Sequence, residues 1–158
     1  DGRRGQPDLL PPGRSERRTM REKKLLFEKF GKVFPAGTIL FEEGQPCEGM
    51  YIIQKGRVRL YKKAGGKKIT IDLLEDGDFF GEMACLLNQP RSINAVVEED
   101  SQILVVEPEV LEELFRERDG LGIKVLGNLA SRLRKSYEVI RSLAEERDSL
   151  SGKESGSP

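Results

Sequence analysis

The sequence contains no histidine and no tryptophan, and only two of its 158 residues are cysteine. Without histidine, Ser-His-Asp triads, histidine general bases and histidine metal sites are all excluded. The same absence excludes the small β-barrel metalloenzymes whose metal is held by a histidine cluster. Most hydrolase mechanisms are thereby excluded. Since Glu82 beside Arg91, without a nucleophile or metal cluster, is a poor catalytic arrangement, we expect a protein that is not an enzyme and that holds no metal and no cofactor.

The two cysteines, Cys47 and Cys85, lie far apart and do not form a CxxC pair. This spacing argues against a zinc site and provides no disulfide framework, so a reducing, cytoplasmic location is expected. The sequence also lacks an apolar run near the roughly 20 residues that a membrane-spanning helix needs. Its first residues lack the charged-then-apolar order of a signal peptide. A soluble protein with no membrane partner is predicted.

Neither sign of charge predominates, because 27 Lys and Arg residues balance 27 Asp and Glu residues. There is no overall positive field to hold a nucleic-acid backbone or an anionic membrane. The four lysines in residues 62–68 flank a glycine pair and are interpreted as a solvated hairpin tip. We expect no nucleic-acid partner within this chain, and a length suited to one domain.

The two ends of the sequence differ in composition from its middle. Residues 1–19 are rich in proline, glycine and charge, and residues 151–158 are similarly polar, so both are predicted to be disordered tails. In residues 20–30, apolar side chains recur at helical spacing and Gly31 follows as a stop signal. A short N-terminal helix is predicted there.

Residues 33–107 alternate brief apolar runs with glycines, which is typical of short strands. The runs are TILF, MYIIQ, RVRLYK, KITIDLL, DFF, INAVVE and QILVVE. Turns are expected at the glycines between them, because glycine adopts positive φ without steric strain. These glycines are Gly37, Gly44, Gly49, Gly56, Gly65, Gly66 and Gly77. Alternation in residues 57–62 places Val58 and Leu60 on the core face. The pattern predicts a mainly β fold, an antiparallel β-roll or jelly-roll barrel with flanking helices.

Two helices are predicted after the strands. Pro108 suits the first position of an amphipathic helix over VLEELFRER, and a long helix follows to Leu150. We divide the chain into a β-roll domain with its flanking helices at 20–119 and a C-terminal helix at 120–150.

The long helix carries a coiled-coil stripe with one hydroxyl in it. The stripe consists of Leu126, Leu129, Leu133, Ser136, Ile140, Leu143 and Leu150. At 1.5 Å per residue the helix is about 42 Å long, more than a small barrel covers. This favours a parallel homodimer, and the alternative is a helix folded back on its own barrel.

Residues 77–92 interrupt the strand pattern with one helical turn between two strands. Gly81 lets the backbone approach a ligand closely, and the amides of Glu82, Met83 and Ala84 are donors at the positive end of a helix, which suits an anion. Arg91 supplies a planar fork that holds a phosphate by two bonds. Glu82 supplies an acceptor for a ribose hydroxyl.

The segment FFGEMACLLNQPRS resembles the phosphate-binding cassette of cyclic-nucleotide-binding domains. These occur in bacterial catabolite-activator-type regulators, protein kinase A regulatory subunits and nucleotide-gated channels, and the similarity runs from about Val33 to Tyr137. The resemblance implies a signal-transduction sensor for cAMP or cGMP. It also implies that Arg91 pairs with phosphate oxygens, Glu82 with the ribose 2′-hydroxyl, and the amides of Ala84 and Ser92 with the phosphate.

Residues 129–137, LASRLRKSY, are similar to the catabolite-activator helix that covers the base. By this resemblance Ser136 and Tyr137 contact the base, and Arg132 reaches back toward Glu82. Ser92 favours cGMP, whereas Ser136 favours an adenine contact. The alternative is that Ser136 is a tolerated polar residue and Tyr137 a ring at the solvent boundary.

Two residues depart from the family pattern, since Ile93 and Asn94 stand where alanine and then threonine or serine are usual. Ile93 adds bulk where the backbone approaches the ligand, so it favours a narrowed, retuned or closed pocket. Three interpretations therefore stay open: a cyclic mononucleotide sensor, a cyclic dinucleotide sensor, and a ligand-free dimerisation scaffold. For Arg91 the alternative is an exposed turn arginine beside Glu82. In a sensor, occupancy would rearrange the C-terminal helix and the dimer and reach a downstream protein partner.

Overall fold

In the computed structural model the chain divides into two compact units, Asp1–Pro108 and Glu109–Pro158. The structure describes residues 13–117 and 120–154. The division falls at the start of the helix that Pro108 begins, shortly after the last strand ends at Val106. The helix predicted from VLEELFRER thus belongs largely to the second unit.

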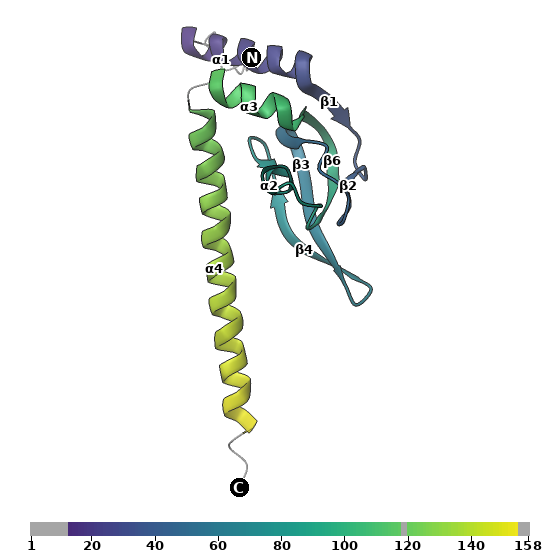
Figure 1. The fold of residues 1–158 in the computed structure, drawn as a ribbon, viewed down its shortest axis with the longest axis vertical. Coiled ribbons are helices and arrows are strands. Elements are labelled where there is room, and N and C mark those ends of the chain that lie inside the picture. The colour runs from purple at the N-terminus through teal and green to yellow at the C-terminus, as the bar shows by residue number, and fades with distance from the viewer. Residues whose placement is uncertain (1–12, 118–119, 155–158) are drawn as a thin grey trace, which may run out of the picture. The chain divides into compact units, whose positions relative to one another are not determined.

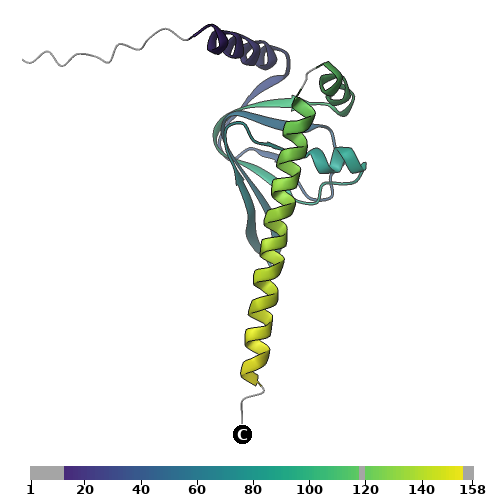
Figure 2. The same cartoon turned by 90° about the vertical axis from the view of Figure 1, so that its left-hand side faces the viewer.

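The first unit is an antiparallel sheet with two helices, as Figure 1 shows. Its elements are α1 (Arg14–Phe30), β1 (Gly31–Phe34), β2 (Ile39–Phe41), β3 (Met50–Ala64), β4 (Lys67–Leu74), β5 (Phe79–Phe80), α2 (Glu82–Leu87) and β6 (Asn94–Val106). The strand order is β1-β6-β3-β4, with β2 pairing β6 and β5 pairing β3. The sheet curls strongly in Figure 2, with α2 beside it. The predicted β-roll with flanking helices is confirmed.

The strands β3 and β6 are longer than predicted, since each joins two of the predicted runs. Gly56, expected in a turn, lies inside β3 with φ +129°. A Cβ atom at Gly56 would overlap the Ser101 side chain, and the Gly56 N–H donates to Asp76 Oδ1 at 2.7 Å. The β3–β6 register shifts on both sides of it. The glycine therefore marks a bulge that lets two backbones approach.

The core lies on the inner face of the curled sheet. Val58 and Leu60 are buried as predicted. The cluster consists of Phe41, Tyr51, Ile53, Val58, Leu60, Leu74, Phe80, Ala95, Val97 and Ile103. The Tyr51 and Phe80 rings stack with centroids 5.0 Å apart, at the point where these two residues pair across β3 and β5.

The helix α1 begins at Arg14, so residues 14–19, predicted as tail, are helical. Residues 1–12 lie outside the described residues. The Gly13 N–H donates to the Glu16 carboxylate at 2.8 Å, and Arg18 pairs with Glu22 at 3.2 Å one turn on. The charged composition that indicated a tail also has good helix propensity, which explains the error. Gly31 ends the helix as predicted.

The second unit holds α3 (Pro108–Glu117) and α4 (Leu121–Glu154). The predicted long helix continues past Leu150, because each added residue gains a backbone hydrogen bond once a helix has formed. Residues 155–158 lie outside the described residues. Five stripe residues are 53% to 65% exposed in the single chain: Leu126, Leu133, Ile140, Leu143 and Leu150. Within the described part, no helix is both long enough and apolar enough to cross a bilayer.

Replacing Ile53 by alanine tests the assignment of the core. Ile53 is fully buried in β3, whereas Ile71 on β4 is 56% exposed. We expect Ile53→Ala to lower the free energy of unfolding by about 2–5 kcal/mol, and Ile71→Ala by well under 1 kcal/mol. Urea unfolding measures both, and equal losses for the two variants would contradict the assigned core.

Candidate functional site

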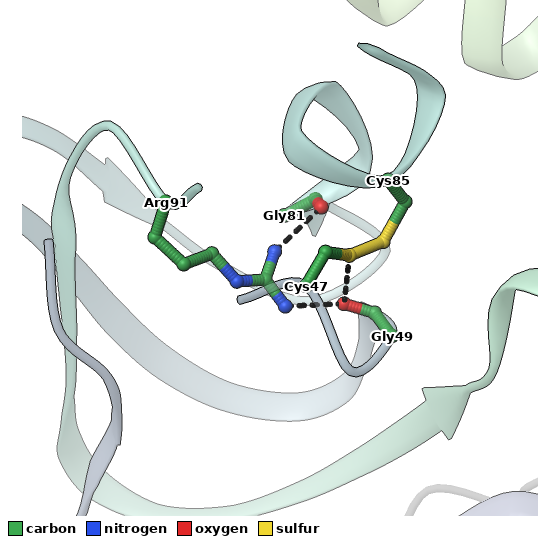
Figure 3. Close-up of a disulfide and its surroundings, with 5 residues drawn as sticks. All are labelled: Cys47, Gly49, Gly81, Cys85 and Arg91. Carbon is green, nitrogen blue, oxygen red and sulfur yellow. Dashed lines mark hydrogen bonds between the residues drawn. A yellow bond between two sulfur atoms is a disulfide. The ribbon is translucent and has the colours of Figure 1, made fainter. Parts of the chain in front are cut away.

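Two loops that are distant in sequence meet where β3 pairs with β5. The register places Tyr51 opposite Phe80. Residues 42–49 precede β3 and Gly81 follows β5 directly, so the antiparallel pairing brings the 42–49 loop against the start of α2. Figure 3 shows this meeting point.

The Arg91 side chain lies between these two segments. Its Nη1 donates to the Gly81 carbonyl at 2.6 Å and its Nη2 to the Gly49 carbonyl at 2.5 Å (Figure 3). The guanidinium carbon lies 4.1 Å from the Phe41 ring centroid and 5.8 Å from that of Tyr51. Arg91 is only 4% exposed, so the alternative of an exposed turn arginine is wrong.

The backbone of Arg91 is held as firmly as its side chain. Its N–H donates to the Gln45 carbonyl and its carbonyl accepts from the Gly44 N–H, each at 2.8 Å. The 42–49 loop therefore fixes both ends of this residue. Sequence reasoning concentrated on residues 77–92 and missed this loop. Its signal was the glycine-punctuated segment FEEGQPCEGMY, which has an aromatic residue at each end.

Burial lowers the pKa of the Arg91 guanidinium from its ordinary value, and the charges of Tyr51, Glu48 and Glu82 act in the opposite direction. The group remains protonated in any case, because arginine keeps its proton in proteins. Burial also raises the pKa of Tyr51, while Arg91 opposes that rise. The Nε of Arg91 is buried with no hydrogen-bond partner within the described residues. A buried cation with donor capacity remaining suits an anionic ligand.

Gly81 is the N-terminal cap of α2 and has φ +81°. A Cβ atom there would lie 2.7 Å from Arg91 Nη1 and 3.3 Å from Tyr51 Cδ2. Gly81 was expected to let the backbone approach a ligand, but here the group that approaches it is the Arg91 guanidinium. The glycine is needed both for the left-handed turn and for this contact.

The other predicted cassette residues differ in their burial. Glu82 is fully buried and Ala84 is 8% exposed, whereas Met83 is 52% exposed and Ser92 is also exposed. The amides of residues 82–84 open α2, where helical N–H groups have no intrahelical acceptor. The helical turn predicted between two strands is therefore present.

Ile93 and Asn94, which depart from the family pattern, both have packing roles. Ile93 is partly buried against the core cluster. Asn94 is 2% exposed, and its Oδ1 accepts the Glu43 N–H at 3.0 Å while its Nδ2 donates to the Tyr61 carbonyl at 3.1 Å. Asn94 thus ties the 42–49 loop to β3.

A cavity of about 450 Å³ opens beside Arg91, within the size range of small-molecule pockets. It is lined by Ile39, Leu40, Phe41, Glu42, Gln45, Pro46, Glu48, Tyr51 and Arg91. Of the residues predicted for the site in the first unit, Arg91 lines this cavity, whereas the cassette residues Gly81, Glu82, Met83, Ala84, Ser92 and Ile93 do not. The bulk of Ile93 therefore packs into the core without filling the space beside the arginine.

Cys47 and Cys85 form a disulfide, with their Cα atoms 5.4 Å apart (Figure 3). The expectation that these cysteines provide no disulfide is wrong. Although 38 residues separate them in sequence, the β3–β5 pairing brings their segments together. Within the described residues, no group of three or more histidine, cysteine, aspartate or glutamate side chains is placed to hold a metal ion.

Arg132, Ser136 and Tyr137 lie on α4. The Ser136 hydroxyl donates to the Arg132 carbonyl at 3.0 Å, and Tyr137 is 61% exposed. Because α4 belongs to the second unit, the contact of these residues with the base stays a prediction.

Residues 31–118 match the model of the cyclic nucleotide-binding domain family, which is more than half of the chain. The chain belongs to this family. Among curated proteins it is 33% identical over 106 residues to the "Cyclic AMP receptor protein" of Thermus thermophilus, covering 66% of this chain and 49% of that protein. It is 28% identical over 118 residues to a "cAMP-dependent protein kinase regulatory subunit" of Pyricularia oryzae, covering 74% and 27%. These relatives are named as receptors and regulators, and the chain spans about half of their length or less.

Solved structures of this family show the same fold. The Thermus thermophilus catabolite activator protein is 29% identical, with a TM-score of 0.68, and the match covers 87% of this chain and 62% of that one. The cAMP-bound form of the EAL enzyme Bd1971 is 28% identical with a TM-score of 0.53, and the match covers 78% and 33%. These two solved structures are thus of a catabolite activator protein and of an enzyme in a cAMP-bound form.

Adding a methyl group at Gly81 tests the close approach of Arg91. Gly77 is a matched control, because it also has positive φ but has no atom within 4 Å of the position that the methyl group would take. Gly77→Ala should lose about 1–2 kcal/mol of stability from backbone strain alone. We expect Gly81→Ala to lose roughly 1–3 kcal/mol more, because it displaces a buried hydrogen-bonded guanidinium. Thermal and urea unfolding measure this, and equal losses would refute the contact.

Proposed function

We propose that this chain is a regulatory module that binds a cyclic mononucleotide, cAMP or cGMP, without chemically transforming it. The observation that carries the proposal is the buried Arg91 guanidinium, held between two backbone carbonyls beside a cavity of about 450 Å³. Family membership supports it, as do the relatives whose names and titles mention cAMP.

The phosphate is the ligand group that matches Arg91. Two guanidinium N–H groups are used by the Gly49 and Gly81 carbonyls, which leaves the Nε and the second hydrogen of each Nη for phosphate oxygens. The amides of Ala84 and Ser92 complete the phosphate contacts, and Glu82 accepts the ribose 2′-hydroxyl. Arg132, Ser136 and Tyr137 then cover the base from α4.

A binding role fits these residues better than catalysis. Catalysis would need a positioned nucleophile, an acid–base pair or a metal ion, and the described residues hold no group of three or more His, Cys, Asp or Glu side chains placed to bind a metal beside Glu82 and Arg91. A cyclic nucleotide of about 22 heavy atoms, at about −0.3 kcal/mol per atom, binds with a Kd of roughly ten micromolar. This affinity is suited to a reversible sensor that needs no cofactor.

Nucleotide occupancy is transmitted through α4, which forms a homodimer with the α4 helix of a second copy. Five exposed apolar residues repeat along α4 at coiled-coil spacing, which a second copy of the helix buries. Ligand contacts made from α4 favour one arrangement of the two helices, so occupancy shifts the population of dimer geometries. A downstream protein partner then reads that geometry.

Removing the Arg91 side chain tests the proposed phosphate contact. We expect Arg91→Ala to weaken cAMP and cGMP binding by about 2–5 kcal/mol, because a buried phosphate loses its charge partner. Arg57→Ala is the control, since Arg57 is a surface residue paired with Glu75. Isothermal titration calorimetry measures affinity, and circular dichroism verifies that both variants fold. Wild-type affinity in a folded Arg91→Ala variant would refute the role.

A thermal-shift series identifies the ligand. At a hundredfold excess over Kd the true ligand stabilises the fold by about 2.7 kcal/mol. We expect a shift with cAMP or cGMP and none with linear AMP, which lacks the cyclised phosphodiester. A shift with cyclic di-GMP alone favours a dinucleotide sensor, and no shift with any nucleotide favours the ligand-free scaffold.

An acidic residue placed in the α4 stripe tests the homodimer. Leu133 is 53% exposed in the single chain and lies in the stripe, whereas Ser131 lies outside it. We expect Leu133→Asp to convert the dimer to a monomer, because two buried carboxylates would face one another, and Ser131→Asp to leave it dimeric. Light scattering after size-exclusion chromatography gives the mass. A wild-type monomer, or a dimer unaffected by Leu133→Asp, would refute the parallel seam.

A further inference from the structure

The Cys47–Cys85 disulfide joins the same two segments that Arg91 joins. Cys47 belongs to the 42–49 loop and Cys85 to α2, while Arg91 bonds to Gly49 of the loop and to Gly81 at the start of α2. The disulfide and the Arg91 side chain also have a common neighbour, the Gly49 carbonyl group. The Gly49 carbonyl oxygen accepts the Arg91 Nη2–H and lies 3.7 Å from Cys47 Sγ (Figure 3).

We propose that Cys47 and Cys85 are a thiol–disulfide modification site that sets the affinity for the nucleotide, with the disulfide form binding more tightly than the dithiol form. This inference rests on the proposed function and adds a regulation of the same site. The residues involved lie entirely in the first unit.

The physical reason is the position of the two carbonyls that hold Arg91. The disulfide fixes the 42–49 loop against α2, so the Gly49 and Gly81 carbonyls stay at the spacing that fits the guanidinium fork. In the dithiol form the loop and α2 are joined by non-covalent contacts alone, and binding must order them. Preorganisation of a site lowers this ordering cost and raises affinity.

A dithiol of low molecular weight supplies the electrons that reduce the Cys47–Cys85 disulfide. Its thiolate attacks one protein sulfur, the Cys47–Cys85 bond breaks, and a mixed disulfide forms with loss of the other protein sulfur as a thiolate. The second thiol of the reagent then displaces the remaining protein thiolate and closes a cyclic disulfide. The protein sulfurs gain two electrons and two protons overall, and a small-molecule disulfide reverses the reaction.

Both cysteines are accessible to such reagents. Each is only partly buried, and the neighbouring α2 side chains Met83 and Leu86 are more than half exposed. The sequence has no other cysteine, so a thiol count reports on this pair alone.

The experiment compares two defined redox forms of the full chain. Treatment with oxidised glutathione followed by its removal gives one form, and treatment with dithiothreitol under anaerobic conditions gives the other. A colorimetric assay in denaturant verifies zero and two thiols. Calorimetric titration with cAMP and cGMP should then give a Kd about 3- to 10-fold lower for the disulfide form. This is the effect expected when one or two groups of the site are already ordered before the nucleotide binds.

A double serine variant supplies a matched control. The double variant Cys47→Ser/Cys85→Ser keeps no thiol for oxidised glutathione to modify, so it should bind with the affinity of the reduced wild type and show no response to either treatment. A response that persists in this variant would overturn the inference, as would failure of the pair to oxidise in the folded chain.

The outcomes separate this inference from the proposed function. Equal affinity in the two verified forms, or tighter binding by the dithiol form, overturns the redox regulation and leaves nucleotide binding intact. No binding of either nucleotide in either form overturns the proposed function itself. A raised melting temperature of the disulfide form without any change in Kd shows a purely structural bond and also overturns the regulatory role.

Discussion

The position of one buried cation governs the geometry of the site. A guanidinium taken out of water is destabilising unless its N–H groups find acceptors. Arg91 finds them in the Gly49 and Gly81 carbonyls, and the faces of Phe41 and Tyr51 cover it. These acceptors come from two loops that meet because β3 pairs with β5. Three features keep the guanidinium in this position. They are the curl of the sheet, the absence of a Cβ atom at residue 81 and the hydrogen-bonded backbone of Arg91.

Much of the fold was predictable because its cause is local. Alternating apolar residues and interspersed glycines indicate strands directly, and the segment FFGEMACLLNQPRS indicates a helical turn bounded by a glycine and an arginine. Gly56 was misjudged because a glycine that allows close strand contact looks the same in sequence as one that allows a turn. The start of α1 was misplaced because charged residues with good helix propensity also look like a tail.

What the sequence concealed depends on contacts through space. The residues that hold Arg91, Gly49 and Gln45 among them, contribute mainly backbone atoms, so their side chains give no hint of the role. The disulfide was missed for a related reason, since the 38-residue separation of the cysteines is closed by strand pairing. Asn94, which looked like a departure from the pattern, is a buried amide that ties the 42–49 loop to β3.

The central claim is that a cyclised phosphodiester binds at Arg91 and the start of α2. Nuclear magnetic resonance of the ¹⁵N-labelled chain tests it most directly, because the amide signals of residues 84 and 92 and the Arg91 Nε signal report on predicted phosphate contacts, and the amide signals of residues 81–83 and 91 lie next to them in the chain. Titration with cAMP or cGMP should move these signals most. Saturating nucleotide that leaves them unmoved, or that moves signals remote from this site alone, would contradict the account.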